Sequence, residues 1–308
     1  MLRTFFVRLS ENPWLRSFAE RSALGRRVSQ RFVAGTEIDD AVRATQAINR
    51  AGRSVTIDNL GENVTNPEEA RHSARLYQQI LDAIVTHQLN ANISLKLTHM
   101  GLDVDEKLAR EIVSGLVAKA AAMNPPGFVR VDMEGSSYTQ RTLDFVHELH
   151  RMPGNANSVG TVIQAYLKRS ESDVEKLLAE GIRIRLCKGA YKESADIAFA
   201  AKADVDANYV KLMKILMKSG IYHGLATHDE NIIQQAQEFA TRENLPRDSF
   251  EFQMLYGIRR DLQRKLVRTG WRIRIYIPFG SEWYPYFMRR LGERPANVLF
   301  VARNLLRS

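Results

Sequence analysis

The chain has 308 residues, 44% hydrophobic and 26% charged, which is ordinary for a globular protein, and no run approaches the roughly 18 apolar residues of a membrane-spanning helix. Its single cysteine, Cys187, excludes an intrachain disulfide and a multi-cysteine metal site and fits a reducing compartment. The formal net charge is +9, but the chain has no nucleic-acid-binding motif or aromatic stacking platform, which argues against a nucleic-acid partner.

The N-terminal segment, residues 1–35, is basic and apolar. Residues 1–32 hold seven arginines and two glutamates, with leucines and aromatic residues among them. This pattern predicts amphipathic helices, which either pack on the body of the protein or lie on a membrane surface. Glu11, Glu20 and Pro13 argue against a mitochondrial presequence.

Eight short strand-like segments follow along the chain. Strand side chains point alternately to opposite faces, and in these segments one face is aliphatic while the other is charged or hydrogen-bonding. Helices would cover the aliphatic faces. The polar faces must then converge on groups that supply partners for their charges and hydrogen bonds, because unpaired buried polar groups are costly. The predicted strands are Ser54–Leu60, Ile93–Thr98, Phe128–Met133, Thr161–Tyr166, Ile182–Lys188, His223–His228, Phe250–Leu255 and Arg272–Pro278.

Segments with helical periodicity separate these strands. The first opens on Thr36-Glu37-Ile38-Asp39, and the second on Asn66-Pro67-Glu68-Glu69, which combines a capping residue, a first-turn proline and early acids. The predicted helices are Thr36–Ala51, Asn66–Gln88, Asp103–Met123, Tyr138–Leu149, Ser170–Ala179, Ala195–Ser219, Glu230–Glu243, Arg259–Thr269, Trp283–Leu291 and Ala296–Leu306.

Eight successive strand–helix units predict an α/β fold of the (βα)8 TIM-barrel type. An open doubly wound sheet is the rival, and it often carries a glycine-rich turn after its first strand. Here the first strand runs into Asn59-Leu60-Gly61-Glu62-Asn63, which has no G-x-G-x-x-G pattern. We therefore expect residues 36–308 to form one catalytic barrel, with a final helix closing its mouth.

The active site of such a barrel lies at the carboxyl ends of its strands. Cations outnumber acids among the polar strand-face residues, which favours an anionic ligand. Beyond the last strand, Arg289 and Arg290 are adjacent and flanked by aromatic residues, so they could grip a small carboxylate; alternatively they face solvent and pair with Glu293. The strand-end residues are Asp58, Lys96, Asp132, Gln164, Arg185, Lys188, Thr227, His228, Gln253 and Tyr276.

Lys96 stands between two leucines, where a lysine is rarely idle, and could form a Schiff base or an ion pair with Asp132. The turn Lys188-Gly189-Ala190-Tyr191 is suited to approach a phosphate or a ring. His228 and Asp229 have no second histidine at a matching spacing, so we expect hydrogen bonding or helix capping there and no metal site.

Taken together, these segments resemble the monofunctional bacterial proline dehydrogenases over nearly the whole chain. The resemblance implies a distorted barrel that binds FAD without a Rossmann fold and oxidises L-proline to Δ1-pyrroline-5-carboxylate. A hydride would pass from C5 to FAD N5, and electrons would continue to a quinone. The matching segments are Ser94–Thr98, Val131–Glu134, Gln164–Tyr166, Lys188–Tyr191, Ala226–His228, Phe250–Gly257 and Tyr286–Pro295.

The same resemblance implies roles for individual residues. Arg289 and Arg290 would grip the proline carboxylate, with Lys96 ion-paired nearby. Asp132 would orient these cations, and Arg185 would lie close to flavin N5. The other residues implied for proline are Tyr276 and Tyr286, as walls for the ring, and Glu293, as a partner of the arginines. Those implied for the flavin are Met133, Gln164, Lys188, Gly189, Ala190, Thr227 and His228.

Two other functions compete with amine oxidation: a cofactor-free lyase with Lys96 as its nucleophile, and a scaffold that binds a membrane or polyanion through its basic ends. The family's pattern differs at Gly135-Ser136-Ser137, where an acidic residue is expected. The sequence does not assign the base that takes the amine proton. We expect a cytoplasmic enzyme whose basic termini contact the inner face of the cell membrane.

Overall fold

The computed structural model describes residues 30–293, with side chains up to residue 288. The predicted terminal helix Ala296–Leu306 and most of the predicted N-terminal helical segment lie outside the described residues. Residues 30–35, which belong to that segment, form a turn and an extended stretch.

Within the described residues, eight parallel strands close into a barrel in chain order, as predicted. The last strand pairs with the first from Ser54↔Arg274 to Asn59↔Phe279. The predicted strand bounds are correct to within about three residues. The strands are Ser54–Asn59 (β1), Ala91–Leu95 (β2), Val129–Val131 (β3), Val159–Gln164 (β4), Arg183–Cys187 (β5), His223–Ala226 (β6), Phe250–Leu255 (β7) and Ile273–Phe279 (β8).

The end of β2 differs from the prediction in a way that matters for the site. The strand stops at Leu95, and Thr98–Met100 form a 3-10 turn that is closed by Gly101 in the left-handed region, at φ 90°. The backbone N–H of Met100 donates to the carbonyl of Lys96 at 3.2 Å. Lys96 therefore lies in the turn after the strand and not in mid-strand.

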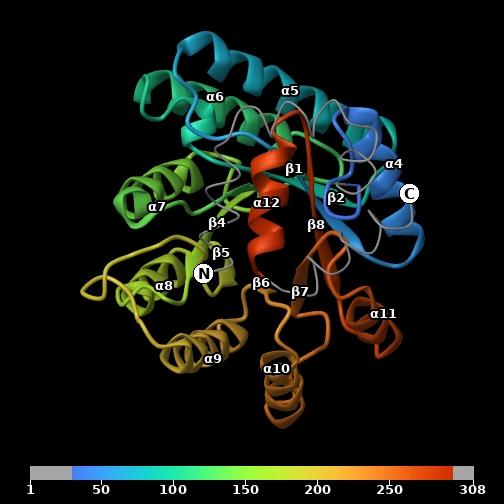
Figure 1. The fold of residues 1–308 in the computed structure, drawn as a ribbon, viewed down its shortest axis with the longest axis vertical. Helices are drawn as coiled ribbons and strands as arrows, with labels where there is room; N and C mark the ends of the chain where they lie inside the picture. The colour runs from blue at the N-terminus through green and yellow to red at the C-terminus, as the bar shows by residue number, and fades with distance from the viewer. Residues whose placement is uncertain (1–29, 294–308) are drawn as a thin grey trace.

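Helices α4 to α11 surround the strands, and α12 crosses in front of the centre of the ring (Figure 1). The helices are Ile38–Arg50 (α4), Pro67–Thr86 (α5), Glu106–Ala121 (α6), Ser136–Arg151 (α7), Ser170–Ala179 (α8), Lys202–Lys218 (α9), Glu230–Arg242 (α10), Arg260–Arg268 (α11) and Trp283–Glu293 (α12).

Two helix starts test the capping predictions. Asn66 caps α5 by accepting the backbone N–H of Glu69 at 3.0 Å, which confirms that prediction. The N-cap of α4 is Glu37 and not Thr36, because the Asp40 carboxylate reaches back to the backbone N–H of Glu37 at 3.1 Å.

Helix α9 begins at Lys202, seven residues later than predicted. The preceding residues make one isolated turn, in which Ala198 N–H donates to the carbonyl of Ser194 at 3.0 Å, and they then bond to the segment after β4. Phe199 N–H donates to the carbonyl of Tyr166 at 2.8 Å, and Lys168 N–H donates to the carbonyl of Ile197 at 3.0 Å. These long-range bonds hold the loop against the mouth of the barrel.

The aliphatic strand faces point outwards and pack against the helices, as predicted. Ile93, Leu95 and Ile184 are fully buried within one cluster that includes helical residues such as Val113 and Leu212. The polar faces point into the barrel, since Arg185 bonds to side chains from strands that are not its neighbours. Hydrophobic burial therefore holds the shell together while the interior remains available for polar chemistry.

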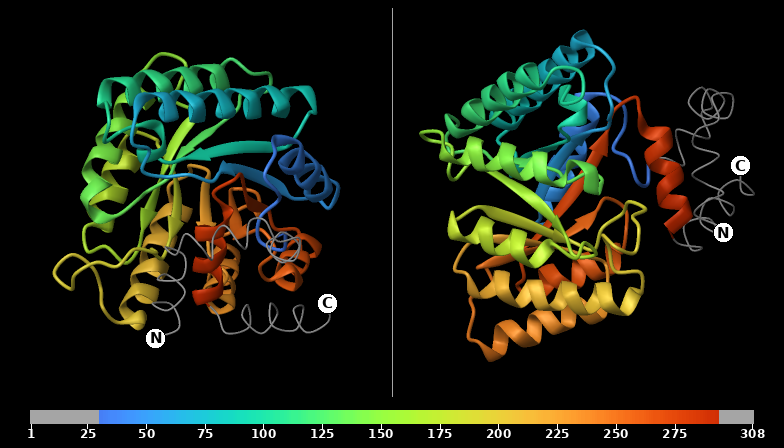
Figure 2. Two further views of the ribbon diagram at one scale, coloured as in Figure 1. Left: turned by 45° about the horizontal axis from the view of Figure 1, so that its top comes forward. Right: turned by 90° about the vertical axis from the view of Figure 1, so that its left-hand side faces the viewer.

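Helix α12 lies against one end of the barrel (Figure 2). It carries part of a second apolar cluster, in which the rings of Phe32 and Phe287 have centroids 6.0 Å apart. Leu60, which follows β1, and Ile258, which follows β7, belong to the same cluster. These contacts place α12 over the carboxyl ends of the strands. Among the described helices, none has the length and apolar composition of a membrane span.

Candidate active site

Arg185 is the central cation of the barrel mouth. Its side chain comes from β5 and is almost fully buried. Nη1 donates to Asp132 Oδ1 at 2.7 Å and to Ser94 Oγ at 3.1 Å, while Nε donates to Gln253 Oε1 at 2.5 Å. The guanidinium also lies 5.2 Å from the centroid of the Tyr276 ring. Nη2 also donates to Thr56 Oγ1 at 3.4 Å, so one arginine joins groups from β1, β2, β7 and β8 and from the residue after β3.

Asp132, the residue that follows β3 by one position, completes this connection. Its Oδ1 accepts from Ser94 Oγ at 2.6 Å as well as from Arg185, and its Oδ2 accepts from the Tyr276 hydroxyl at 2.9 Å. A buried guanidinium needs a paired carboxylate with further hydrogen bonds to offset its desolvation. Asp132 meets that need and holds Arg185 and Tyr276 in one fixed arrangement.

Lys96 pairs with Asp58 at the end of β1, and its Nζ lies 3.8 Å from Asp58 Oδ2. The alternative pairing with Asp132 is wrong as a direct contact, because Asp132 is engaged by Arg185 and Tyr276. Burial alone would lower the pKa of Lys96, but the carboxylates of Asp58 and Asp132 raise it above its ordinary value. A Schiff-base lysine needs the opposite shift, so the site disfavours the lyase hypothesis.

The Asp58 carboxyl is almost completely buried, and this burial raises its pKa to about 6, against the opposing attraction of Lys96. Tyr77 on α5 donates to Asp58 Oδ1 at 3.3 Å and to the carbonyl of Ser94 at 2.7 Å. Asp58 therefore changes its charge in a range where ordinary aspartates are already ionised.

We expect Asp58 to make folding stability depend on pH. Its pKa is higher in the folded state than in the unfolded chain, so its favourable contribution is complete below about pH 4 and is lost as the pH rises through 6. The unfolding free energy of the wild type minus that of Asp58→Asn should therefore fall by roughly 2.5 kcal/mol between pH 4 and pH 7. Chemical denaturation across that range measures the difference, and a constant difference would contradict the assignment.

The residues predicted to bind a cofactor lie on the β3–β6 side of the mouth. Gln164 donates from Nε2 to the carbonyl of Glu134 at 2.8 Å. Lys188 pairs with Asp206 at 2.5 Å and with Asp229 at 2.9 Å. The remaining residues of this set are at the strand ends: Met133, Gly189, Ala190, Thr227 and His228.

Thr227 and His228 shape the turn after β6. The Thr227 hydroxyl accepts the backbone N–H of Asp229 at 3.1 Å, and His228 Nε2 accepts the backbone N–H of Leu255 at 2.9 Å. His228 therefore makes the hydrogen bond expected of it, and Asp229 caps α10. Within residues 30–293, no three His, Cys, Asp or Glu side chains gather as a metal-binding group.

Gly189 has a conformational reason to be glycine. Its φ is +112°, and a Cβ at this position would lie 2.1 Å from Cδ1 of the Tyr166 ring. Only glycine lets this backbone turn lie so closely against the ring. The turn after β5 therefore presents main-chain groups beside Lys188, at the edge of the mouth.

Helix α12 carries the residues predicted to bind a carboxylate. Tyr286 is buried in the apolar cluster with Leu60, Ile258 and Phe287. The backbones of Arg289, Arg290 and Glu293 belong to the same helix, whereas their side chains lie outside the described part of the structure. Their roles stay predictions.

The sequence pattern assigns no role to three residues that the structure brings to the site or its support. Asp58 is at the end of a polar strand face, but it was given no role. Ser94 has the same strand parity as Lys96 and could have been found from that alternation. Tyr77 lies on a helix, and no strand pattern could have shown that its hydroxyl reaches Asp58 and the backbone of β2.

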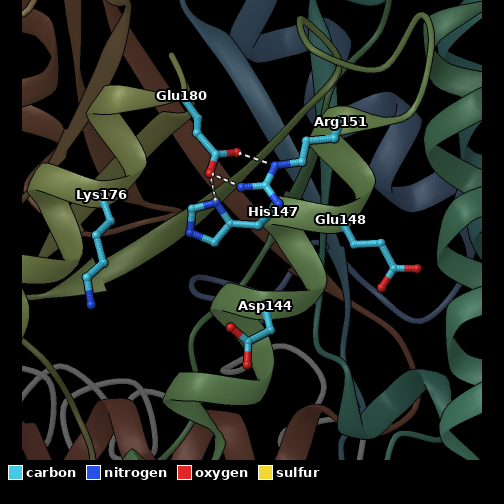
Figure 3. Close-up of a pocket in the computed structure, with 6 residues that line it drawn as sticks. All are labelled: Asp144, His147, Glu148, Arg151, Lys176 and Glu180. Carbon is cyan, nitrogen blue, oxygen red and sulfur yellow. Dashed lines mark hydrogen bonds and ion pairs between the residues drawn. The ribbon is translucent and has the colours of Figure 1, made fainter.

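A separate surface pocket of about 490 Å3 lies between α7 and α8, and Glu180 joins two of the other side chains that line it (Figure 3). Glu180 binds Arg151 at 2.5 Å and His147 at 2.9 Å. These residues lie near the carboxyl ends of their helices, which point away from the carboxyl ends of the strands. None of the predicted site residues lines this pocket, so it is not the barrel-mouth site. Its lining residues are Asp144, His147, Glu148, Arg151, Lys176 and Glu180.

A family model and individual relatives point to the same family. A sequence model of the family described as proline dehydrogenase matches residues 41–303. The chain is 41% identical to proline dehydrogenase 1 of Bacillus subtilis over 308 residues, covering 100% of both chains. It is 37% identical to the proline dehydrogenase of Deinococcus radiodurans over 310 residues, covering 100% of this chain and 98% of the relative.

Solved structures show the same architecture. Proline utilization A (PutA) of Bdellovibrio bacteriovorus, inactivated by N-propargylglycine, superimposes with a TM-score of 0.80 at 26% identity. The match covers 87% of this chain and 32% of that one, so the chain spans about a third of the solved protein. A second PutA structure, with proline bound in remote sites, matches with a TM-score of 0.71 at 25% identity, covering 89% of this chain and 31% of that one.

Proposed function

Because this chain belongs to the proline dehydrogenase family, we propose that it oxidises L-proline to Δ1-pyrroline-5-carboxylate with bound FAD and passes the electrons to a quinone. This reaction opens proline catabolism. The observation that carries the proposal is the connected group of Arg185, Asp132 and Tyr276, with the Lys96–Asp58 pair beside it, at the carboxyl ends of the strands. That group is built to receive a small anion beside a fixed positive charge.

The residues at the mouth fit FAD. A flavin ring and a diphosphate need cationic, amide and main-chain donors, and the β4–β6 side provides Gln164, Arg185 and Lys188. The glycine turn at Gly189 offers close backbone approach beside Lys188. Thr227, His228, Met133 and Ala190 would complete the lining. When bound, FAD supplies the acceptor for the two electrons and the hydrogen that leave proline.

The opposite side of the mouth suits proline. Arg289 and Arg290 on α12 would grip the carboxylate, with Glu293 as their partner. Lys96, held by Asp58, adds a third positive charge. Tyr276 and Tyr286 would lie against the ring, and the orientation of Tyr276 is fixed by its hydrogen bond to Asp132 at 2.9 Å.

The oxidation removes hydrogen with an electron pair from C5 and a proton from the ring nitrogen, leaving a carbon–nitrogen double bond. A carboxylate clamp holds C5 in one position. Much of the entropy that proline must lose to align with its hydride acceptor is therefore lost at binding and not during the reaction. Arg185 places a fixed positive charge where electron density increases, without reorganisation during the reaction. Asp132 and Arg185 are the residues that we assign to the chemical step, with Asp132 acting through the groups it holds.

The basic ends of the chain support a membrane role for electron transfer. Residues 259–308 hold twelve arginines or lysines and three acids, and residues 1–32 are also basic. Such segments are attracted to anionic lipid surfaces. We propose an enzyme of the cytoplasm whose N-terminal segment, residues 1–35, and the basic C-terminal end of its catalytic barrel, residues 36–308, contact the inner face of the membrane, where the quinone lies.

The proposal is tested by the visible spectrum of the purified protein. We expect flavin absorption bands that bleach when L-proline is added without oxygen, and that do not bleach with cyclopentanecarboxylate, which has the same ring size and the same carboxylate but no amine. Borohydride treatment with proline should leave Lys96 unmodified. A protein with no flavin bands, or one whose bands are unaffected by proline, would overturn the proposal.

A further inference from the structure

Below Arg185, a line of buried polar side chains runs towards the amino ends of the strands. Arg185 Nε donates to Gln253 Oε1 at 2.5 Å, and Gln253 Nε2 donates to Glu251 Oε1 at 2.7 Å. Glu251 in turn accepts from Arg274 Nε at 2.6 Å and from the Tyr222 hydroxyl at 2.9 Å. Gln253 and Glu251 are two residues apart on β7, so both point into the barrel.

The chemistry of the end groups determines how the Gln253 amide is oriented. The guanidinium of Arg185 can only donate hydrogen bonds, and an ionised Glu251 can only accept them. The amide must therefore turn its oxygen towards Arg185 and its NH2 group towards Glu251. A carboxylate at position 251 excludes the flipped amide, which would place donors against donors at one end and acceptors against acceptors at the other.

Glu251 remains ionised although it is buried. Burial alone would raise the pKa of its carboxyl, but the positive charge of Arg274, with the hydrogen bonds from Arg274, Gln253 and Tyr222, lowers the pKa below its ordinary value. Arg274 is anchored by its own bond from Nη1 to the carbonyl of Val55 at 2.7 Å. Residues of the barrel interior thus keep Glu251 ionised, and in that form its side chain can only accept hydrogen bonds.

We propose that Glu251 and Gln253 are positioning residues for Arg185: Glu251 fixes the Gln253 amide, and Gln253 holds the Nε side of the guanidinium in one orientation. This inference rests on the proposed function, in which Arg185 lies at the flavin. Asp132 and Ser94 hold Nη1 from the β2–β3 side. Gln253 supplies the support from the β7 side, and Thr56 Oγ1 on β1 accepts a longer bond from Nη2 at 3.4 Å, so that these supports together prevent the side chain from swinging across the barrel.

Two variants test the proposal. Glu251→Gln places an amide at 251, which can donate as well as accept and no longer dictates the orientation of Gln253. Gln253→Met removes the acceptor for Arg185 but leaves the Glu251–Arg274 pair intact, so it serves if the first variant fails to fold. In both, we expect kcat with proline to fall roughly ten- to a hundredfold, KM to change less than about threefold, and the flavin midpoint potential to decrease.

A double-mutant cycle with Arg185→Met separates positioning from general damage. If Gln253 acts through Arg185, adding Gln253→Met to Arg185→Met should cause no further loss of kcat and no further shift in potential. Asp173→Asn is the matched control, because it removes an equally buried carboxylate on α8, outside the barrel interior, that pairs with Arg169 just before that helix. This control should reduce thermal stability without moving the potential.

A readout that needs no flavin completes the test. In isotope-labelled apoprotein, the Arg185 Nε–H signal, identified by its absence in Arg185→Met, should exchange slowly with water and should exchange at least about tenfold faster in Gln253→Met. Unchanged exchange together with an additive cycle would overturn the positioning role. If wild-type flavin fails to bleach with proline, the proposed function fails; normal bleaching in wild type and in both variants removes only this inference.

Discussion

Replacing Arg289 with methionine is expected to raise the KM for proline about a hundredfold or more while FAD stays bound. A forked, charge-assisted contact to a carboxylate contributes roughly 1.5–3 kcal/mol per hydrogen bond, and methionine keeps the length and apolar stem of the side chain without the donors. Steady-state kinetics with proline, together with the flavin content from the visible spectrum, measures both parts of this result.

The control for this variant is Arg268→Met on α11. Arg268 is exposed and, within residues 30–293, forms no ion pair, so it matches the loss of one arginine charge away from the mouth. Its KM should equal that of the wild type. A KM for Arg289→Met that is also unchanged would remove the clamp assignment from α12.

Arg185→Met is expected to lower the flavin midpoint potential and to reduce kcat roughly 100- to 1,000-fold. The variant removes the buried positive charge that would stabilise electron-rich reduced flavin, and it leaves Asp132 without its guanidinium partner at 2.7 Å. Spectroelectrochemical titration measures the potential, and anaerobic mixing with proline measures the rate of bleaching.

Arg183→Met is the matched control on the same strand. Arg183 is two residues nearer the start of β5, roughly 7 Å along the strand, and its guanidinium lies 4.3 Å from the centroid of the Phe128 ring. Its removal should leave the potential near the wild-type value. A potential in Arg185→Met that equals the wild-type potential would contradict its placement beside the flavin.

Strand alternation explains why the barrel could be predicted from sequence. Residues such as Arg183 and Arg185 alternate with Ile184 and Leu186, and this period of two separates an inner polar face from an outer aliphatic face. The same argument identified the barrel mouth without any knowledge of which strands pair. Helix periodicity located α4 to α12 because each helix buries one apolar stripe on the barrel.

The partners of the charged groups could not be predicted in this way. Lys96 pairs with Asp58 and not directly with Asp132, because β2 ends at Leu95 and the following turn changes the direction of the lysine. Tyr77 reaches the site from a helix. The choice among several possible ion pairs depends on distances between strands, which the local sequence pattern does not contain.

Glu251 shows a different reason for an incomplete prediction. Its position on the inner face of β7 follows from the same alternation that identified Gln253, but a glutamate beside phenylalanines also suits an exposed strand position. Its burial becomes favourable only through Arg274 and Tyr222, which come from β8 and from the segment before β6. The burial of Glu251 is therefore stabilised by tertiary contacts, which the sequence of β7 alone does not contain.

The proposed reaction depends on cations from distant parts of the chain meeting around one carboxylate beside the flavin. The most direct measurement is a crystal structure of the FAD-bound protein with tetrahydrofuran-2-carboxylate, a ring acid of the same size that lacks the amine. We expect its carboxylate within hydrogen-bonding distance of Lys96 and of Arg289 or Arg290, with Arg185 on the opposite side of the ring, against the flavin. A carboxylate bound elsewhere, or Lys96 and Arg185 directed into separate regions, would contradict the account.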